Sequence, residues 1–294
     1  MSSQDVLKNL KPEREFFVGI DSDGCAFPTM ELKHKECFIP NIVKYFNLQS
    51  ISKYAREAAE FVNLYSKWRG INRFPALLMV IDLLAERPEV QRSGVQLADL
   101  SDLQSWVDTG VALGNPTLKE EVNRSGNPTL ERVLAWSEAV NESVHWMVEG
   151  CKPFAFVRES LEKMAPEADM AVVSATPGAA LEKEWKEHDI ARYARVIAGQ
   201  ELGSKKEHLG LAAGGKYPPE KILMIGDAPG DMKAARANNA LFFPVNPGQE
   251  EKSWELLYKE AFGRFVQGSY AGAYEAGLID KFEALLPDTP PWKK

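Results

Sequence analysis

The chain has 294 residues, which is enough for one large domain or two smaller ones. Apolar residues make up 45% and charged residues 26% of the chain, so it can build a sizeable core and is not a disordered protein. The 35 basic and 42 acidic side chains give a formal net charge of −7. Since no basic tract accompanies this charge, we do not expect a nucleic-acid partner.

The cysteines Cys25, Cys37 and Cys151 are too few and too scattered for a disulfide framework or a structural zinc site. A reducing compartment is therefore expected. The first residues lack the apolar core of a signal peptide, and the longest apolar stretch, at 74–84, is short and contains Asp82. These features predict a cytoplasmic protein that has no membrane-spanning segment.

In chain order, the first predicted element is a buried strand at 16–20. A helical region follows, with helices expected at 51–68, 72–85, 99–108, 117–124 and 128–148. Strands and helices then alternate, with strands at 170–173, 194–198, 222–225 and 241–245, and helices at 178–188, 205–213 and 230–239. Two more helices are expected between 253 and 286. This order predicts a Rossmann-like, doubly wound α/β domain with a parallel sheet, formed by 12–27 and 151–294, and an inserted helical domain at 28–150.

Carboxylates follow two of the predicted strands. The first strand leads into Asp21-Ser22-Asp23-Gly24, and the strand at 222–225 leads into Gly226-Asp227, with Asp231 four residues further on. In open α/β sheets, ligands bind just outside the carboxyl ends of the strands. Several carboxylates gathered there would raise one another's pKa, and a hard divalent cation such as Mg²⁺ relieves that repulsion.

A hydroxyl and a lysine complete this pattern. The strand at 170–173 leads into Ser174-Ala175-Thr176-Pro177 and then a helix. The Ser174 hydroxyl and the backbone N–H of Ala175 therefore offer an anion site at a helix N-terminus. Lys205 and Lys206 open the next predicted helix. These residue types together predict a magnesium-dependent site for phosphoryl transfer.

The same residues resemble the motifs of the haloacid dehalogenase-like (HAD) superfamily, in the same order along the chain. The resemblance implies that Asp21 is a nucleophile, that Asp23 is the general acid and base, and that Ser174 binds the transferring phosphoryl group. It implies that Mg²⁺ is held by Asp21, the Asp23 backbone carbonyl, Asp227 and Asp231. Lys205 is preferred over Lys206 as the active-site lysine, because Lys205 begins the Lys-x-x-x-Leu pattern of that motif.

The helical insert stands where this superfamily places its C1-type cap, which closes over the site and selects the substrate. At 28–150 it is long for such a cap. The polar turn 66–73 between two apolar helices is rich in hydrogen-bond donors, and we expect Arg69 and Arg73 to contact an anionic substrate there. The alternative is that both are ordinary charges of a helix–loop–helix.

The resemblance implies an HAD-like phosphatase acting on a small phosphate ester. Asp23 favours ester hydrolysis over phosphonate cleavage and dehalogenation, because relatives with those activities lack an acid at this position. Two alternatives remain, a phosphomutase that uses the same aspartyl-phosphate and a non-catalytic protein that binds a phosphorylated ligand. A phospho-acceptor signalling domain is disfavoured, because its aspartate and lysine would occur in a different order. The sequence leaves open a monomer or a homodimer.

Overall fold

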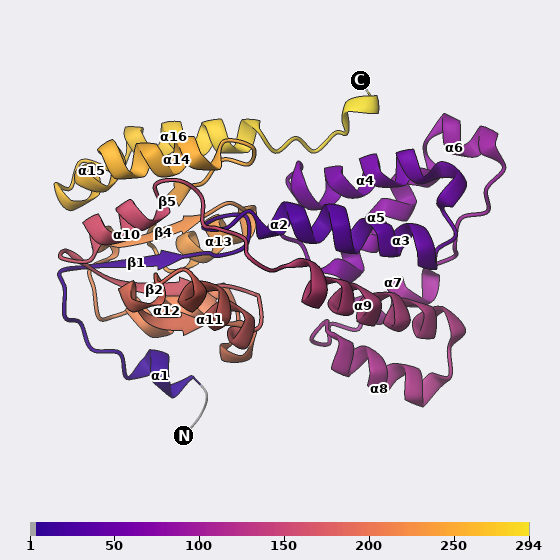
Figure 1. Cartoon of the computed structure of the whole chain (residues 1–294), viewed down its shortest axis with the longest axis horizontal. Coiled ribbons are helices and arrows are strands. Elements are labelled where there is room, and N and C mark those ends of the chain that lie inside the picture. The colour runs from indigo at the N-terminus through magenta and orange to yellow at the C-terminus, as the bar shows by residue number, and fades with distance from the viewer. Residues whose placement is uncertain (1–3, 294) are drawn as a thin grey trace. The chain divides into compact units, whose positions relative to one another are not determined.

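The computed structural model describes residues 4–293. These residues form two compact units (Figure 1), which we call the α/β unit and the helical unit. The α/β unit contains residues 4–29 and 150–286, and the helical unit contains residues 30–149 and 287–293. Within the described residues, no helix combines the length and hydrophobicity needed to cross a membrane.

The α/β unit is built on a five-stranded parallel sheet in the order β3-β2-β1-β4-β5. The strands are β1 (Phe16–Ile20), β2 (Ala168–Val173), β3 (Ala194–Ala198), β4 (Ile222–Gly226) and β5 (Leu241–Pro244). All positions of β1, β2 and β4 are buried, because helices cover both faces of the sheet. The expected doubly wound fold is therefore confirmed, and each expected strand forms.

The order of the strands decides where a ligand can bind. The chain proceeds from β1 outward to β2 and β3, and then returns to the other side of β1 for β4 and β5. The sheet therefore has its switch point between β1 and β4, where crevices form at the carboxyl ends of strands. Ile20 pairs with Ile225 across these two strands, so the residues that follow them start from neighbouring positions.

Helices flank both faces of this sheet. They are α1 (Asp5–Lys8), α10 (Val157–Met164), α11 (Gly178–Glu187), α12 (Lys205–Ala213), α13 (Pro229–Ala237), α14 (Glu250–Leu256), α15 (Phe262–Val266) and α16 (Ala273–Ala284). Alternate side chains of β1 enter two cores, with Phe16 packing beside α10, α11, α14 and α15, and Phe17 packing beside α1, α12 and α13. Shorter helical segments are Gln200–Leu202, Ala191–Tyr193, Pro219–Lys221 and the π-helical Leu257–Ala261.

The helical unit has its own core around Trp136, which packs against the rings of Phe38, Phe46 and Phe74. Its helices are α2 (Thr29–Leu32, whose first residue belongs to the α/β unit), α3 (Ile39–Tyr45), α4 (Ser52–Leu64), α5 (Arg73–Ala85), α6 (Pro88–Ser93), α7 (Ser101–Asp108), α8 (Asn115–Ser125) and α9 (Pro128–Met147). The short segments Gln49–Ile51 and Pro291–Lys293 are 3₁₀ helices.

One long helical segment was missed by the sequence patterns. A π-helical stretch, Lys33–Phe38, joins α2 to α3 in a continuous run from 29 to 45. The Asn41 side chain donates a hydrogen bond to the Cys37 carbonyl at 2.8 Å, which gives that carbonyl a partner within the irregular stretch. The wider π turn shifts the side chains out of the regular helical spacing, so no 3.6-residue pattern marks this segment.

The C-terminal residues belong to a different unit from the one that the sequence assigned. Residues 287–293 were placed in the α/β domain, yet they pack within the helical unit. The Trp292 ring lies against Phe61 at 5.7 Å between centroids, and the Arg87 guanidinium lies 4.4 Å from the Trp292 ring. The Pro287 carbonyl also accepts a hydrogen bond from the Lys67 N–H. An aromatic anchor therefore decides the position of this tail, and no periodic pattern in the sequence predicts it.

Candidate active site

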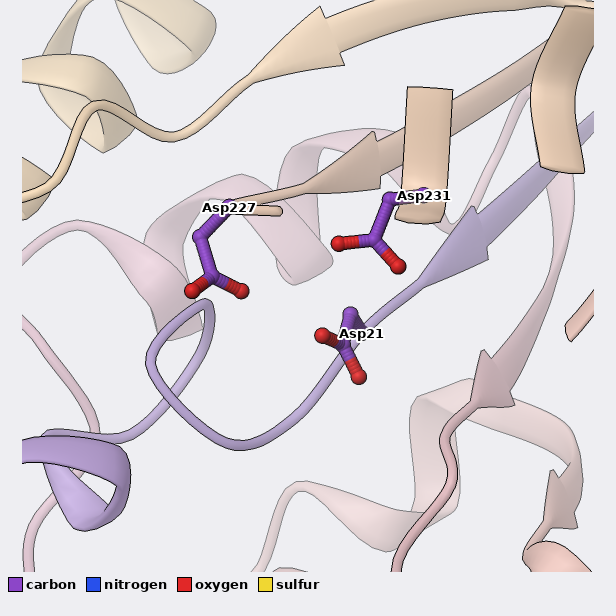
Figure 2. A group of neighbouring side chains, drawn as sticks. All are labelled: Asp21, Asp227 and Asp231. Carbon is purple, nitrogen blue, oxygen red and sulfur yellow. The ribbon is translucent and has the colours of Figure 1, made fainter. Parts of the chain in front are cut away.

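Three aspartates meet at the carboxyl ends of β1 and β4 (Figure 2). Asp21 follows β1, Asp227 follows β4, and Asp231 lies in the first turn of α13. One carboxylate oxygen from each lies within 4.8 Å of the others, and the exposed fractions are 4%, 0% and 0%. The structure therefore brings together three of the four carboxylates that the sequence singled out.

Local geometry fixes Asp231 in this cluster. Its Oδ2 accepts the Ala228 N–H at 3.0 Å, so the carboxylate binds one of the free N–H groups at the start of α13. Gly226 leaves the space for this side chain, since a Cβ at that position would lie only 2.3 Å from the Asp231 Cβ. The glycine at the end of β4 is thus a requirement for the position of Asp231.

Lys205 is the cation of this cluster. Its Nζ lies 2.7 Å from Asp21 Oδ2 and 2.6 Å from Asp231 Oδ1. The Ser204 hydroxyl accepts the Glu207 N–H, while Glu207 accepts the Ser204 N–H, and this capping box fixes the start of α12 at Lys205. Lys206 is exposed, one position further along the helix. Of the two lysines that the sequence offered, the structure brings Lys205 to the carboxylates.

Burial and neighbouring charges both shift the pKa values in this cluster. Burial raises the pKa of Asp21 well above its ordinary value; Lys205 opposes this shift, and Asp231 and Asp227 add to it. Burial alone would lower the pKa of Lys205, but the charges of Asp21 and Asp231 outweigh it and raise that pKa. Among the described residues, these three buried carboxylates cluster beside the Lys205 ammonium, and they offer the hard oxygen ligands that a divalent cation prefers.

The Asp23 carboxylate lies outside this cluster of three. Its Oδ1 accepts a hydrogen bond from the Thr29 hydroxyl at 2.5 Å, and its Oδ2 accepts one from the Thr176 hydroxyl at 2.6 Å. The side chain is therefore oriented by two hydroxyl donors. Sequence reasoning missed both threonines as site residues, and only the position of Thr176 two residues after Ser174 was a signal for one of them.

The loop after β2 places Ser174 at the end of its strand, 2% exposed. Its N–H donates to the Ala198 carbonyl at 3.0 Å, and its Oγ accepts the Thr176 N–H at 3.2 Å. Ala175 follows it in the same loop. The anion site expected at the start of α11 needs one correction, because Gly178 donates its N–H to Glu201 Oε2 at 3.0 Å. A carboxylate from the chain itself already binds the first N–H of this helix.

The two arginines of the helical unit differ in their surroundings. Arg69 is 3% exposed and donates from Nη1 to the Leu64 carbonyl at 2.8 Å, so its side chain ties the turn together. Arg73 donates from Nη1 to Asn141 at 2.8 Å and to the Ser137 hydroxyl at 2.9 Å. Burial lowers the pKa of Arg73 to about 10, and no carboxylate among the described residues opposes that shift.

Comparison with known proteins bears on this site. A family model, described as haloacid dehalogenase-like hydrolase, matches residues 102–245. The chain belongs to the haloacid dehalogenase-like superfamily. The matched region contains Ser174, Lys205, Asp227 and Asp231, and begins after Asp21. The placement of Asp21 beside them therefore comes from the structure.

Several solved structures of haloacid dehalogenase-like proteins are similar to this chain. A family hydrolase from Streptococcus pneumoniae is 13% identical, with 83% of this chain and 90% of that chain covered and a TM-score of 0.49. A subfamily IA hydrolase from Geobacter sulfurreducens is 12% identical, with the same coverages and a TM-score of 0.41. A predicted phosphoglycolate phosphatase from Haemophilus somnus is 14% identical, with 79% and 86% covered and a TM-score of 0.45. No curated protein matches the sequence.

The family membership confirms two of the sequence-based expectations. The chain is a haloacid dehalogenase-like protein, and it belongs to a family of enzymes that are hydrolases. The motifs that carried the resemblance lie on the elements that the superfamily order implied, with Asp21 after β1, Ser174 after β2, Lys205 at the start of α12 and Asp227 after β4.

Proposed function

We propose that this chain is a Mg²⁺-dependent phosphatase that hydrolyses a small phosphate ester through an aspartyl-phosphate on Asp21. The observation that carries the proposal is the position of Lys205, whose Nζ bridges Asp21 and Asp231 inside a buried group of three carboxylates. This arrangement combines a nucleophile, a fixed positive charge and hard oxygen ligands at the switch point of the sheet.

The donor set fits magnesium. Asp21, Asp227 and Asp231 offer carboxylate oxygens, which this hard cation prefers, and these oxygens lie within 4.8 Å of one another. Asp21 and Asp227 would hold the ion, with the Asp23 backbone carbonyl beside them and Asp231 ligating directly or through water. When bound, the ion neutralises charge on the oxygens of the transferring phosphoryl group.

The residues of the chain account for both steps of hydrolysis. A carboxylate oxygen of Asp21 attacks the phosphorus, the bond from phosphorus to the leaving oxygen breaks, and Asp23 gives that oxygen a proton. Asp23 then takes a proton from water, which attacks the aspartyl-phosphate and releases phosphate with the Asp21 carboxylate restored. Ser174, the Ala175 N–H and Lys205 bind the phosphoryl oxygens during both steps.

We further propose that residues 28–150 act as a C1-type cap and that Arg73 binds an anionic group of the ligand. The proposal is supported by the guanidinium of Arg73, which is partly buried and has no carboxylate partner among the described residues. We assign Arg69 a structural role.

The Arg73→Gln variant should raise KM about ten-fold with kcat nearly unchanged, while the exposed control Arg56→Gln should match the wild type. Equal KM values for the two variants would contradict the role of Arg73.

The proposed activity is tested by a phosphate-release screen of sugar phosphates, nucleotides and phosphonates, with Mg²⁺ and with a chelator. We expect release from at least one ester, loss with the chelator, and loss in Asp21→Asn. If no ester releases phosphate, the phosphatase proposal is refuted, and the alternative of a non-catalytic protein that binds a phosphorylated ligand is favoured. Product analysis over time distinguishes a phosphomutase, because it would conserve phosphate esters instead of releasing phosphate. Sedimentation separates a monomer from a homodimer.

A further inference from the structure

Ser22, the residue between Asp21 and Asp23, has an unusual environment for a loop side chain. It is 0% exposed, and its Oγ lies 3.0 Å from Trp185 Nε1 and 3.1 Å from Glu184 Oε2. An indole N–H can only donate and a carboxylate can only accept, so Ser22 accepts from Trp185 and donates to Glu184. Both hydrogen-bonding capacities of one hydroxyl are used by two consecutive residues of α11.

The backbone of Ser22 also holds the loop that carries the two aspartates. Its carbonyl accepts the N–H groups of Cys25, Ala26 and Phe27 at 3.2, 2.8 and 3.1 Å. Its own N–H donates to Asp21 Oδ1 at 2.8 Å. A shift of Ser22 therefore moves an Asp21 contact and the whole turn together.

Helix α11 reaches the catalytic loop at two points. Its last turn contacts Ser22 through Glu184 and Trp185, and the segment just before the helix contacts Asp23 through the Thr176 hydroxyl at 2.6 Å. Trp185 is itself 0% exposed and packs edge-on against Phe27 at 6.1 Å between centroids. The indole is thus a rigid support, to which Ser22 is joined by a hydrogen bond and Phe27 by a ring contact.

We propose that Ser22 is a positioning residue, which holds Asp21 and Asp23 in register with the loop 174–177 through Trp185 and Glu184. This inference rests on the proposed phosphatase activity. Its chemical reason is that an apolar side chain at position 22 would leave the buried Trp185 N–H without its acceptor. Displacement of a reacting group by about 1 Å costs up to about 100-fold in rate.

Trp254 provides a matched comparison. Its indole is also 0% exposed and donates to the Cys25 carbonyl of the same loop at 2.7 Å. Trp185→Phe and Trp254→Phe therefore remove the same kind of bond from one loop. Only the first acts through the hydroxyl of Ser22, so only the first should be coupled to Ser22→Ala.

The experiment compares Ser22→Ala, Trp185→Phe and their double variant, and pairs Trp254→Phe with Ser22→Ala. We expect each of the first two to lower kcat for Mg²⁺-dependent phosphate release by about ten-fold or more, with KM changed less than about two-fold. The kcat of the double variant should be no lower than that of its less active parent. The fold losses in kcat caused by Trp254→Phe and by Ser22→Ala should instead multiply when the two are combined. Thermal unfolding midpoints report any purely structural loss.

A second measurement is independent of turnover. Hydrogen exchange of the Cys25, Ala26 and Phe27 amides should accelerate in both Ser22→Ala and Trp185→Phe, because these amides bond to the Ser22 carbonyl. Unchanged protection, or a kcat within about two-fold of the wild type despite a lower midpoint, would overturn the inference. A wild type without phosphate release would refute the proposed function instead, and the exchange data would still decide the role of Ser22.

Discussion

A single methyl group at Gly226 should disable the site. Its Cβ would lie 2.3 Å from the Cβ and 2.4 Å from the Cγ of Asp231, whereas ordinary contacts begin at 3.4 Å. Asp231 would have to withdraw by at least about 1 Å, which exceeds the slack of a hydrogen bond. Its contacts with Lys205 at 2.6 Å and with the Ala228 N–H at 3.0 Å would both be lost or distorted.

The expected loss for Gly226→Ala is about 100-fold in kcat, or about 2.7 kcal/mol of transition-state stabilisation. Gly230→Ala is the matched control, because a Cβ at that position meets nothing within 4 Å. Both variants are assayed by Mg²⁺-dependent phosphate release, and circular dichroism checks that each is folded. Activity of Gly226→Ala within about two-fold of Gly230→Ala would refute the reasoning from this close approach.

Three further predictions concern charge and packing. Lys205→Met should lower kcat by about 100-fold, because two buried carboxylates lose their cation. The control Lys206→Met changes an exposed lysine and should leave kcat nearly unchanged. Similar losses in the two variants would contradict the role of Lys205. Burial lowers the pKa of His208, so the unfolded chain takes up its proton first and the free energy of unfolding should fall as the pH drops below about 6.5. In urea titrations, the free energy of unfolding of His208→Leu should depend less steeply on pH than that of the wild type. An equal slope in the two proteins would refute this prediction. In the same urea titration, Trp292→Ala should lower the free energy of unfolding by about 1–2 kcal/mol, because the ring packs against Phe61 and the Arg87 guanidinium. The neighbouring Lys293→Ala should lower it by less than about 1 kcal/mol. A larger loss in Lys293→Ala than in Trp292→Ala would contradict the aromatic anchor.

Much of the α/β unit could be predicted from local sequence. The runs that form β1 and β4 are apolar at each position apart from glycine, because helices cover both faces of the sheet. The polar residues at the ends of these strands then stand out, which is how Asp21 and Asp227 were found. A helix was also expected to begin at Lys205, and α12 begins there, with Ser204 as its cap.

Other features of the candidate site have no local signal. Thr29 and Thr176 are ordinary threonines until the fold brings both to Asp23, and Arg69 looks like a surface cation although its side chain is buried. The role of Glu201 at the start of α11 is of the same kind. Short polar side chains occur in many loops, so their partners are set by which loops meet and not by their neighbours in sequence.

By itself, the sequence determined most of the elements and the residue types that carry the chemistry, because hydrophobic periodicity and strand-end carboxylates are local properties. Tertiary structure alone decided that β4 returns beside β1, which brings Asp21, Asp227 and Asp231 within 4.8 Å. It also decided that Lys205 faces them and that Trp292 packs in the helical unit. These outcomes depend on which surfaces bury each other, and contacts between residues far apart in the chain leave no pattern along it.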